Sequence, residues 1–517
     1  MVQEDDDFAR RWRTLAVLCL SLVIVVVGNT VLNVALPTLV RELGATSSQL
    51  QWIVDSYALV FAGLLLTAGA LGDRFGRKGA LTAGLVIFGV ASGVSALATS
   101  AGQLVALRAV MGVGAALIMP ATLSILTNVF PPQERARAIA IWAGLAGAGA
   151  AFGPIASGFL LEHFWWGSVF LVNLPVVAAA LIGGRRLVPR SRDTAQPPLD
   201  PVGALLSIVG LGALLYGIIE GPNHGWTDPV TLAWGAGGVA VLAVFGLWER
   251  RSTHPMLDLG FFRNPTFSSA AGAITLIFFA MFGTFFVFTQ YLQLVLGYGT
   301  LEAGVRMLPM AFTMMVAAPS SARLVERFGS RRVVTTGLCL VAAGLLLLSF
   351  LSVDTPYWRL VLNLMVMAAG MGLSMAPSTT GIMASLPLGK AGVGSAVNDT
   401  TRELGGALGV AVLGSLLASR YAASLTDALG GLLRGPALEA AKSSLGGALG
   451  VAGTLPGPAG EAVAAAARSA FVDAMSTSLA VSSAVVLLAA FLVNRYYPER
   501  IVVERPPARA GSTPEAA

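Results

Sequence analysis

Residues 69–78 read GALGDRFGRK, and residues 322–331 read ARLVERFGSR. In both stretches an acid, an arginine, a phenylalanine and a glycine follow one another, as residues 73–76 and 326–329. Each stretch lies between two long apolar runs. The recurrence predicts an internal repeat of two similar halves, although short basic loops can also resemble each other by chance.

The apolar runs around these loops place the chain in a lipid bilayer. Its 517 residues are 55% hydrophobic and only 12% charged, with a mean hydropathy of +0.76, which is too apolar for a soluble domain. The 33 Lys+Arg and 27 Asp+Glu residues give a net charge of +6, but the cations cluster between apolar runs, as in membrane topology and not as in nucleic-acid binding. Cys19, Cys339 and three scattered histidines exclude a disulfide framework and a catalytic metal cluster, and no cofactor is expected.

Fourteen apolar segments are long enough to cross a bilayer, since a crossing helix needs about 20 residues. They are 15–37, 52–71, 79–99, 103–128, 136–160, 168–188, 202–219, 231–248, 266–296, 303–325, 333–352, 358–383, 392–418 and 475–495. If the last six repeat the first six, the seventh and eighth are an insertion between two parallel halves, an arrangement that suits alternating access.

The basic residues predict the orientation of these segments. They gather in alternate loops, for instance at 10–13, 74–78, 185–192 and 327–332, so these loops and both termini are expected to be cytoplasmic. The long connection 421–472 then lies outside. It is rich in Ala, Gly and Ser and is expected to form short helices over the outer mouth, as a spacer or as a lid.

The segments predict a domain order. Residues 1–188 are expected to form a six-helix bundle, and residues 189–263 a linker with two inserted transmembrane helices. A second six-helix bundle, with its outer loop, spans 264–496, and 497–517 form a cytoplasmic tail. The expected fold is therefore an all-α integral membrane fold of two bundles plus two extra central helices.

Several motifs resemble those of a known family. GALGDRFGRK resembles the loop signature G-x-L-x-D-R-x-G-R-[RK] of the major facilitator superfamily, and RAVMGVGAA (108–116) is similar to its R-x-x-Q-G-x-G-A-A, with Met111 in place of Gln. GAAFGPIASG (149–158) looks like the glycine-rich signature of drug/proton antiporters. With TVLNVALP (30–37), WIVDSY (52–57) and QYLQLVLG (290–297), the chain resembles the fourteen-helix QacA/EmrB-like multidrug exporters, and the resemblance implies the major facilitator fold.

Asp55 and Arg108 are the clearest candidates for proton coupling. An ionised side chain inside a bilayer costs at least ~2.5 to 3.5 kcal/mol on insertion scales, so a charge away from a helix end is a functional candidate. At a rise of ~1.5 Å per residue, Asp55 lies ~6 Å and Arg108 ~8 Å from the starts of their segments, so the two can share a depth. A neighbouring guanidinium favours the ionised carboxylate, and a dry cavity favours the neutral acid. A conformational change that alters either effect would therefore make the carboxylate a proton switch. Alternatively, both side chains snorkel to the outer surface.

The resemblance also implies an acid that this chain lacks. In the family, the arginine of the fourth segment and an acid of the first are associated with proton coupling. Where relatives often read D-x-T, this chain has Gly28, Asn29 and Thr30. Because an isolated carboxylate balances a single positive charge, we expect monovalent cations or neutral amphiphiles to be preferred over dications.

The thirteenth segment places Asp399, Arg402 and Glu403 within two helical turns. Asp399 and Arg402 have the i, i+3 spacing of an ion pair. QacA-like exporters often carry an acid at the position of Glu403, so Arg402 and Glu403 join the candidates for proton coupling. Capping is the alternative, because Thr400-x-x-Glu403 also fits a capping box.

The two similar loops are expected to form a gate. In this interpretation Asp73 pairs with Arg77 or with a helix N-terminus, and the basic residues hold the cytoplasmic side shut. Positive-inside topology explains the cations alone, but not the spacing of the acid and the glycines. The candidate gating residues are Gly69, Asp73, Arg74, Gly76, Arg77, Lys78, Glu326 and Arg327.

Two further groups complete the candidate site. The antiporter motif, with Gly149, Gly153, Pro154 and Gly158, is expected to let helices pack closely and bend, although ordinary membrane packing explains part of it. Polarizable, aromatic and amide side chains are expected to receive substrate, since such walls accept many apolar shapes and cations, unless they only face lipid. These are Asn33, Phe282, Phe286, Gln290, Gln293, Met310 and Met314.

Together these features predict a proton-coupled antiporter that exports amphipathic, mainly cationic drugs, antiseptics or dyes across the bacterial inner membrane. A dedicated exporter of one endogenous product, such as an antibiotic, siderophore or lipid, fits the same motifs. An enzyme is not expected, because no nucleophile, metal or nucleotide motif is present. The expected partners are a small-molecule drug, protons and the lipid bilayer, without nucleic acid, and the protein is expected to be a monomer.

Overall fold

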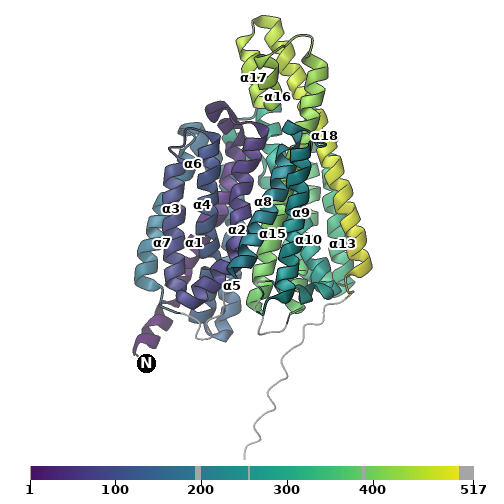
Figure 1. Ribbon diagram of the computed structural model, residues 1–517. Helices are drawn as coiled ribbons and strands as arrows, with labels where there is room; N and C mark the ends of the chain where they lie inside the picture. Colours follow the sequence, from purple (N-terminus) through teal and green to yellow (C-terminus); the bar gives the residue numbers. More distant parts are fainter. Residues whose placement is uncertain (1, 192–199, 254, 256, 387–390, 500–517) are drawn as a thin grey trace, which may run out of the picture.

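Long helices that run side by side build the chain (Figure 1). The computed structural model describes residues 2–191, 200–253, 255, 257–386 and 391–499, and within its helices some side chains, among them those of 2–9, 73, 146–152 and 391–396, lie outside the description. The described helices are α1 (Val2–Leu43), α2 (Ser47–Phe75), α3 (Arg77–Ser95), α4 (Ala101–Val129), α5 (Pro132–His163), α6 (Ser168–Leu171), α7 (Asn173–Leu187), α8 (Pro201–His224), α9 (Pro229–Arg251), η1 (Leu259–Arg263), α10 (Pro265–Gln290), η2 (Tyr291–Val295), α11 (Thr300–Arg306), α12 (Leu308–Phe328), α13 (Ser330–Leu348), α14 (Tyr357–Ala384), α15 (Ala391–Leu429), α16 (Pro436–Ser443), α17 (Leu445–Thr454) and α18 (Gly457–Tyr496).

Twelve helices of the described residues are long and apolar enough to cross a membrane. Two of them, Ser168–Leu187 and Thr300–Phe328, are each built from two helices that meet at a break. The two other segments that the sequence suggests as spans, 52–71 and 136–160, fall within α2 and α5 and are not among the twelve.

The two similar loops have the same backbone geometry. α2 ends at Phe75 and α3 begins at Arg77, with Gly76 between them at φ 119°. α12 ends at Phe328 and α13 begins at Ser330, with Gly329 between them at φ 84°. A positive φ is costly for a residue with a Cβ atom, so glycine permits each reversal. The internal resemblance therefore extends from sequence letters to backbone conformation.

A short segment that follows the last helix of each half binds each loop in the same way. The backbone N–H of Arg77 donates to Ser191 O at 3.0 Å, and Lys78 Nζ donates to Val188 O at 2.6 Å, just past the end of α7. In the second half, Ser330 N donates to Glu499 O at 2.9 Å, and Arg331 Nε donates to Tyr497 O, just past the end of α18. Residues 188–191 and 497–499 are hereafter called the two straps.

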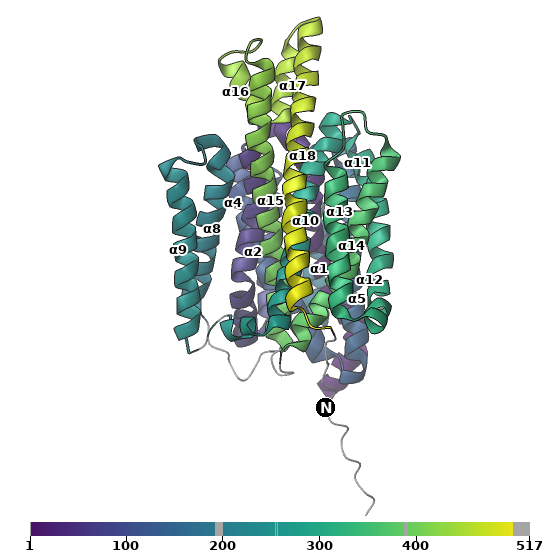
Figure 2. The same ribbon diagram turned by 90° about the vertical axis from the view of Figure 1, so that its right-hand side faces the viewer.

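The molecule has a terminal face and a distal face. The loops α2–α3 and α12–α13, the start of α1 and the end of α18 lie at the terminal face, and α16 and α17 lie at the distal face (Figures 1 and 2). The connection 421–472 is less loop-like than expected, because α15 continues to Leu429 and α18 begins at Gly457, so both project beyond the bundle. The reason is composition, since alanine-rich sequence such as 462–470 favours helix.

The expected short helices are present as α16 and α17, and they pack on the N-terminal half. Ser47 Oγ, at the start of α2, donates to Ser443 O at 2.8 Å. Tyr421 Oη donates to Ala441 O at 3.1 Å and thereby ties α15 to α16.

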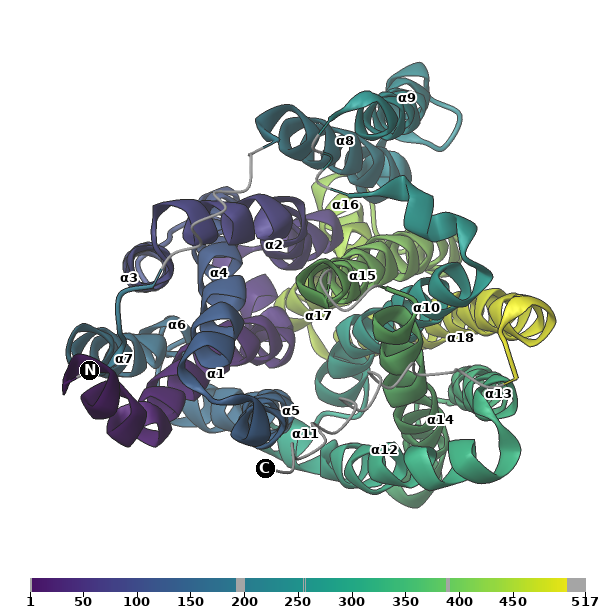
Figure 3. The same cartoon turned by 90° about the horizontal axis from the view of Figure 1, so that it is seen from below.

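Seen from the terminal face, α1–α7 lie on one side and α10–α15 with α18 on the other (Figure 3). Helices α8 and α9 lie at the edge, with α8 beside both α2 and α15. A separate apolar cluster joins these three helices and contains Ala58, Leu59, Leu215, Ile219, Ala407 and Ala411. The inserted pair thus packs on both sides of the seam between the halves.

Candidate functional site

Arg108 is the most deeply buried cation of the described chain. It lies on α4, and its side chain has no exposed area. Its Nε donates to Ile53 O at 3.1 Å and its Nη1 to Gly28 O at 3.0 Å, while Nη2 has no hydrogen-bond partner in the described structure. The guanidinium also lies 4.2 Å from the ring centroid of Tyr57. Two carbonyls and one aromatic face therefore hold this charge inside the bundle.

Asp55 is equally buried, but it is not paired with Arg108. Its side chain is 0% exposed, and neither carboxylate oxygen has a hydrogen-bond partner in the described structure. The two residues do not form the adjacent pair that their similar depth suggests, because Arg108 donates to the backbone of α1 and α2 instead. They also do not snorkel to the surface.

The position of Asp55 on α2 connects it to the other half. It lies one turn from Gln51, whose Oε1 accepts a hydrogen bond from Ser415 Oγ on α15 at 3.1 Å. Ala58, almost one further turn along α2, belongs to the apolar cluster with Ala411 of α15. Residues spaced by three or four share a face of a helix, so Asp55 is on the face of α2 that packs against α15.

Gly28 does not lie where the missing acid was expected to act. A Cβ atom at this position would lie 2.7 Å from Cζ of Phe88 on α3, and therefore inside the N-terminal half. A side chain at residue 28 would therefore point toward α3. The carbonyl of Gly28 instead accepts the hydrogen bond from Arg108.

A second charged group lies on α15. Arg402 Nη1 is 3.8 Å from Asp399 Oδ1, in agreement with their i, i+3 spacing, and its guanidinium lies 5.4 Å from the ring centroid of Phe278. Thr400 and Glu403 lie inside α15 and not at its start, so a capping box is excluded as the explanation for their spacing. Glu403 is partly exposed and interacts electrostatically with Arg108 across the two halves.

The antiporter motif lies at the other seam between the halves. A Cβ atom at Gly158 of α5 would lie 2.5 Å from Cα of Leu301 in α11, and one at Gly304 would lie 2.6 Å from Pro154 O. At Gly153 a Cβ atom would collide with Thr30 of α1. The surroundings of Gly149 lie outside the description. Small residues thus bring α5 close to both α1 and α11.

Hydrogen bonds close the distal side of both seams. Gln293 Nε2 donates to Val34 O at 2.9 Å, and Thr300 Oγ1 donates to Gly158 O at 3.1 Å. Together with the bond between Ser415 and Gln51, they connect α1, α2 and α5 to the second half. The cross-half hydrogen bonds named here all lie toward the distal face. This conformation is therefore sealed at its distal face.

The candidate gating residues bind within their own halves. Arg77 and Lys78 donate to carbonyls of the N-terminal half, and Arg331 to the second strap. Arg74, Glu326 and Arg327 are exposed, and a Cβ atom at Gly69 would lie 3.4 Å from Pro120 Cβ of α4. The side chain of Asp73 lies outside the described residues. The described hydrogen bonds of Arg77, Lys78 and Arg331 thus stay within their own halves, and the cross-half lock stays a prediction.

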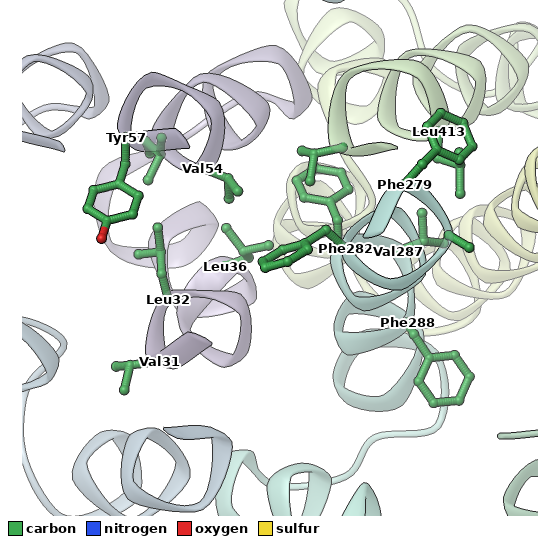
Figure 4. Close-up of a cluster of buried hydrophobic side chains, with 14 of the residues drawn as sticks. Val31, Leu32, Leu36, Val54, Tyr57, Phe279, Phe282, Val287, Phe288 and Leu413 are labelled. Carbon is green, nitrogen blue, oxygen red and sulfur yellow. The ribbon is translucent and has the colours of Figure 1, made fainter. Parts of the chain in front are cut away.

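Only some of the expected substrate residues lie between the halves. Phe282 of α10 and Leu36 of α1 point toward one another (Figure 4), and the Phe282 ring stacks on Phe278 at 6.1 Å. Gln293 binds Val34 O instead of presenting its amide to a ligand, and Gln290 Nε2 binds Phe286 O in its own helix.

The other expected substrate residues are less informative. Phe286 and Met310 are buried, Met314 is partly buried, and Asn33 Oδ1 is buried without a hydrogen-bond partner in the described chain. Two cavities lie elsewhere, along α3. None of the expected substrate residues lines them.

Sequence reasoning missed three of the residues that make these contacts. Tyr57, Gln51 and Ser415 have ordinary polar or aromatic identities, and only the packing of α2 against α4 and α15 gives them a role. Tyr57 belongs to the WIVDSY motif. Nothing in the spacing of that motif indicates that the tyrosine ring lies against the guanidinium of Arg108.

Comparisons with known proteins agree with this architecture. Residues 18–410 match the family described as Major Facilitator Superfamily. The chain is 38% identical to the multidrug efflux pump LfrA of Mycolicibacterium smegmatis, over 94% of this chain and 96% of that protein. It is 36% identical to the methyl viologen resistance protein SmvA of Salmonella typhimurium, over 93% and 97% of the two chains. It is 35% identical to the tetracenomycin C resistance and export protein of Streptomyces glaucescens, over 93% and 90%.

Solved structures share the fold. A bacterial homolog of the human lysosomal transporter Spinster, in an inward-facing and unoccupied conformation, superposes with a TM-score of 0.68 at 18% identity, covering 94% of this chain and 98% of that one. The D-xylose-proton symporter has a TM-score of 0.61 at 14% identity, with 94% and 98% covered. These matches indicate a multi-pass membrane transporter and not an enzyme, with relatives that act in multidrug efflux and antibiotic resistance.

Proposed function

We propose that this chain, which belongs to the Major Facilitator Superfamily, is a proton-coupled antiporter that exports amphipathic, mainly cationic drugs, antiseptics or dyes. The observation that carries the proposal is Asp55, a carboxylate without a described partner, on the α2 face that packs against α15. The relatives named for multidrug efflux and for methyl viologen resistance support the substrate class.

The placement of Asp55 suggests how a proton is coupled to the conformational change. Burying an unpaired carboxylate is costly, so the sealed arrangement favours its neutral, protonated form. Separation of α2 from α15 at the distal face would hydrate Asp55 and favour the ionised form. Protonation then favours closure of this seam. Glu403, partly exposed on α15, is the next candidate for the proton site.

The architecture proposed for this function has fourteen spans, with α2 and α5 added to the twelve. Their lengths of 29 and 32 residues are sufficient, since a crossing needs about 20. The first and last six spans, within 1–188 and 264–496, form two bundles, and α8 and α9 lie between them. By the positive-inside rule, the terminal face is cytoplasmic in the bacterial inner membrane.

Transport by the purified protein in liposomes tests the proposal. A pH gradient alone, outside acidic relative to the cytoplasmic side, should drive a fluorescent lipophilic cation against its concentration gradient, and a protonophore should stop it. Substrate movement that ignores both the gradient and the protonophore would contradict proton coupling.

A dedicated exporter of one natural product is a second candidate. The relative named for tetracenomycin C resistance and export favours it. Transport of several unrelated dyes would argue for the multidrug function, and transport of one compound class alone would argue for the dedicated one.

A further inference from the structure

A cavity lies on the outside of the N-terminal half, at the terminal end of α3. Its volume is about 890 Å³, and its walls come from the α2–α3 loop, one face of α3 and the first strap. It does not open between the halves, so it is not explained by the proposed transport function. A molecule bound in this cavity would contact both the α2–α3 loop and the first strap.

The cavity is basic at one end and apolar at the other. Lys78 and Arg190 line the end at the terminal face, and the described lining contains no acid. Lys78 is held in place by its bonds to Val188 O at 2.6 Å and Arg185 O at 2.9 Å, whereas Arg190 is exposed. Further along α3 the lining is Ala83, Val86 and Ile87. A small soluble anion would use only the basic end.

A second, apolar groove continues the cavity along the same helix. It has a volume of about 350 Å³, is lined by residues of α3 and α7, and shares Val86 with the first. Val86 is 45% and Val90 62% exposed on this side of the protein. From Gly79 to Val94 the two run along 15 residues of α3, or ~22 Å at ~1.5 Å per residue. This length exceeds ~15 Å, one leaflet of a ~30 Å hydrocarbon core.

We propose that the cavity and groove together bind one anionic glycerophospholipid from the leaflet at the terminal face. The phosphate headgroup lies against the exposed Arg190, near the positive charge of Lys78, and one acyl chain follows α3 past Val86 and Val90. Basic pockets beside transmembrane helices are suited to anionic headgroups, and the apolar extension selects a lipid over a free phosphate. This inference does not rest on the proposed function.

Lipid binding to the purified full-length protein tests this site. Native mass spectrometry in detergent measures the half-saturating concentrations of phosphatidylglycerol and of phosphatidylcholine with the same acyl chains. Phosphatidylglycerol should bind more tightly, and Arg190→Gln should weaken it about fivefold, as expected for one cation at an anionic surface. Val90→Trp should fill the groove and weaken both lipids. Because Val90 is 62% exposed, this change adds no side chain to the packed interior.

Matched variants outside the site provide the controls. Arg332→Gln removes an exposed arginine at the start of α13, and Leu488→Trp adds a tryptophan at a position of α18 that is 60% exposed. Both should leave the preference for phosphatidylglycerol unchanged. Equal binding of the two lipids, or equal effects of Arg190→Gln and Arg332→Gln, would overturn the proposal. Full displacement of the lipid by glycerol phosphate would instead identify a site for a soluble anion.

Discussion

Arg108 Nη1 donates a hydrogen bond to the carbonyl oxygen of Gly28, 3.0 Å away, and thereby joins α4 to the middle of α1. The bond occupies the region where relatives often carry an acid. Arg108 thus already has acceptors, Gly28 O and Ile53 O, without a carboxylate. This arrangement bears directly on what an added acid would do.

Gly28→Asp should destabilise the protein and should not add transport of dications. The new side chain would meet Phe88 Cζ at 2.7 Å from its Cβ atom, and overpacking of this kind costs about 1–3 kcal/mol. Thermal unfolding of the purified variant and liposome transport of methyl viologen and a matched monocation measure both effects. Wild-type preference for the monocation is expected, and a gain of methyl viologen transport with unchanged stability would place residue 28 in the substrate path after all.

Asp55→Asn should abolish pH-driven accumulation while substrate binding survives. The amide cannot exchange a proton, but it has nearly the same shape and adds no charge to the buried face of α2. Liposome transport under a pH gradient and equilibrium binding of the same dye separate the two effects. Asp473→Asn, at an exposed acid of α18, is the matched control. Accumulation by Asp55→Asn driven by pH alone would move the proton site to Glu403.

Arg108→Ala should both destabilise the fold and shift the pH dependence of transport. The substitution removes two hydrogen bonds of a charged group, which should lower the free energy of unfolding by about 3 kcal/mol or more. Gly28 O and Ile53 O lie inside helices and keep their backbone N–H donors, so the loss comes from the bonds of Arg108 itself. Arg108→Lys should be intermediate, because one ammonium lacks the planar fork that reaches both carbonyls. Equal thermal unfolding of wild type and Arg108→Ala would rule out this structural role.

Gly158→Ala should disfavour the conformation that is sealed at the distal face. A Cβ atom there would lie 2.5 Å from the backbone of Leu301, so α5 and α11 would have to separate, at a cost of about 1–3 kcal/mol. Accessibility of a cysteine at position 51 to a soluble thiol reagent measures opening of the distal face. Gly450→Ala, where no atom lies within 4 Å of a Cβ, is the control and should change nothing.

Asp73→Asn should slow turnover with little effect on expression or binding, since the acid is expected to bias a conformation and not to touch substrate. Turnover by a well-folded variant, compared with its dye affinity, provides the measurement. Wild-type turnover would leave the loop with a purely topological role.

The sequence anticipated the features that depend on local chemistry. The glycines of the two loops could be recognised because each ends one helix and starts the next, and both lie at positive φ. The pair Asp399 and Arg402 could be recognised because both lie on one helix. The small residues of α5 could likewise be recognised as a close-packing surface.

Features that depend on the rotation of one helix against another could not be anticipated. Spacing gives the depth of Asp55 and Arg108, but not the direction of either side chain, so their separation required the packed structure. The same limit applies to Gly28, which faces Phe88, and to Gln293, which binds Val34. The projection of α15 and α18 beyond the bundle depends on where two helices end, which composition determines only loosely.

The two straps have a consequence for how such a chain could have grown. The first strap completes its bundle at Ser191 and then continues toward α8, whereas the second completes its bundle at Glu499. The strap therefore binds its loop at equivalent points of the two halves, at Ser191 before α8 and at Glu499 after α18. A segment inserted after Ser191 would leave the hydrogen bonds between each strap and its loop intact. The pair α8 and α9 occupies that place, so its presence leaves the strap contacts of both halves unchanged.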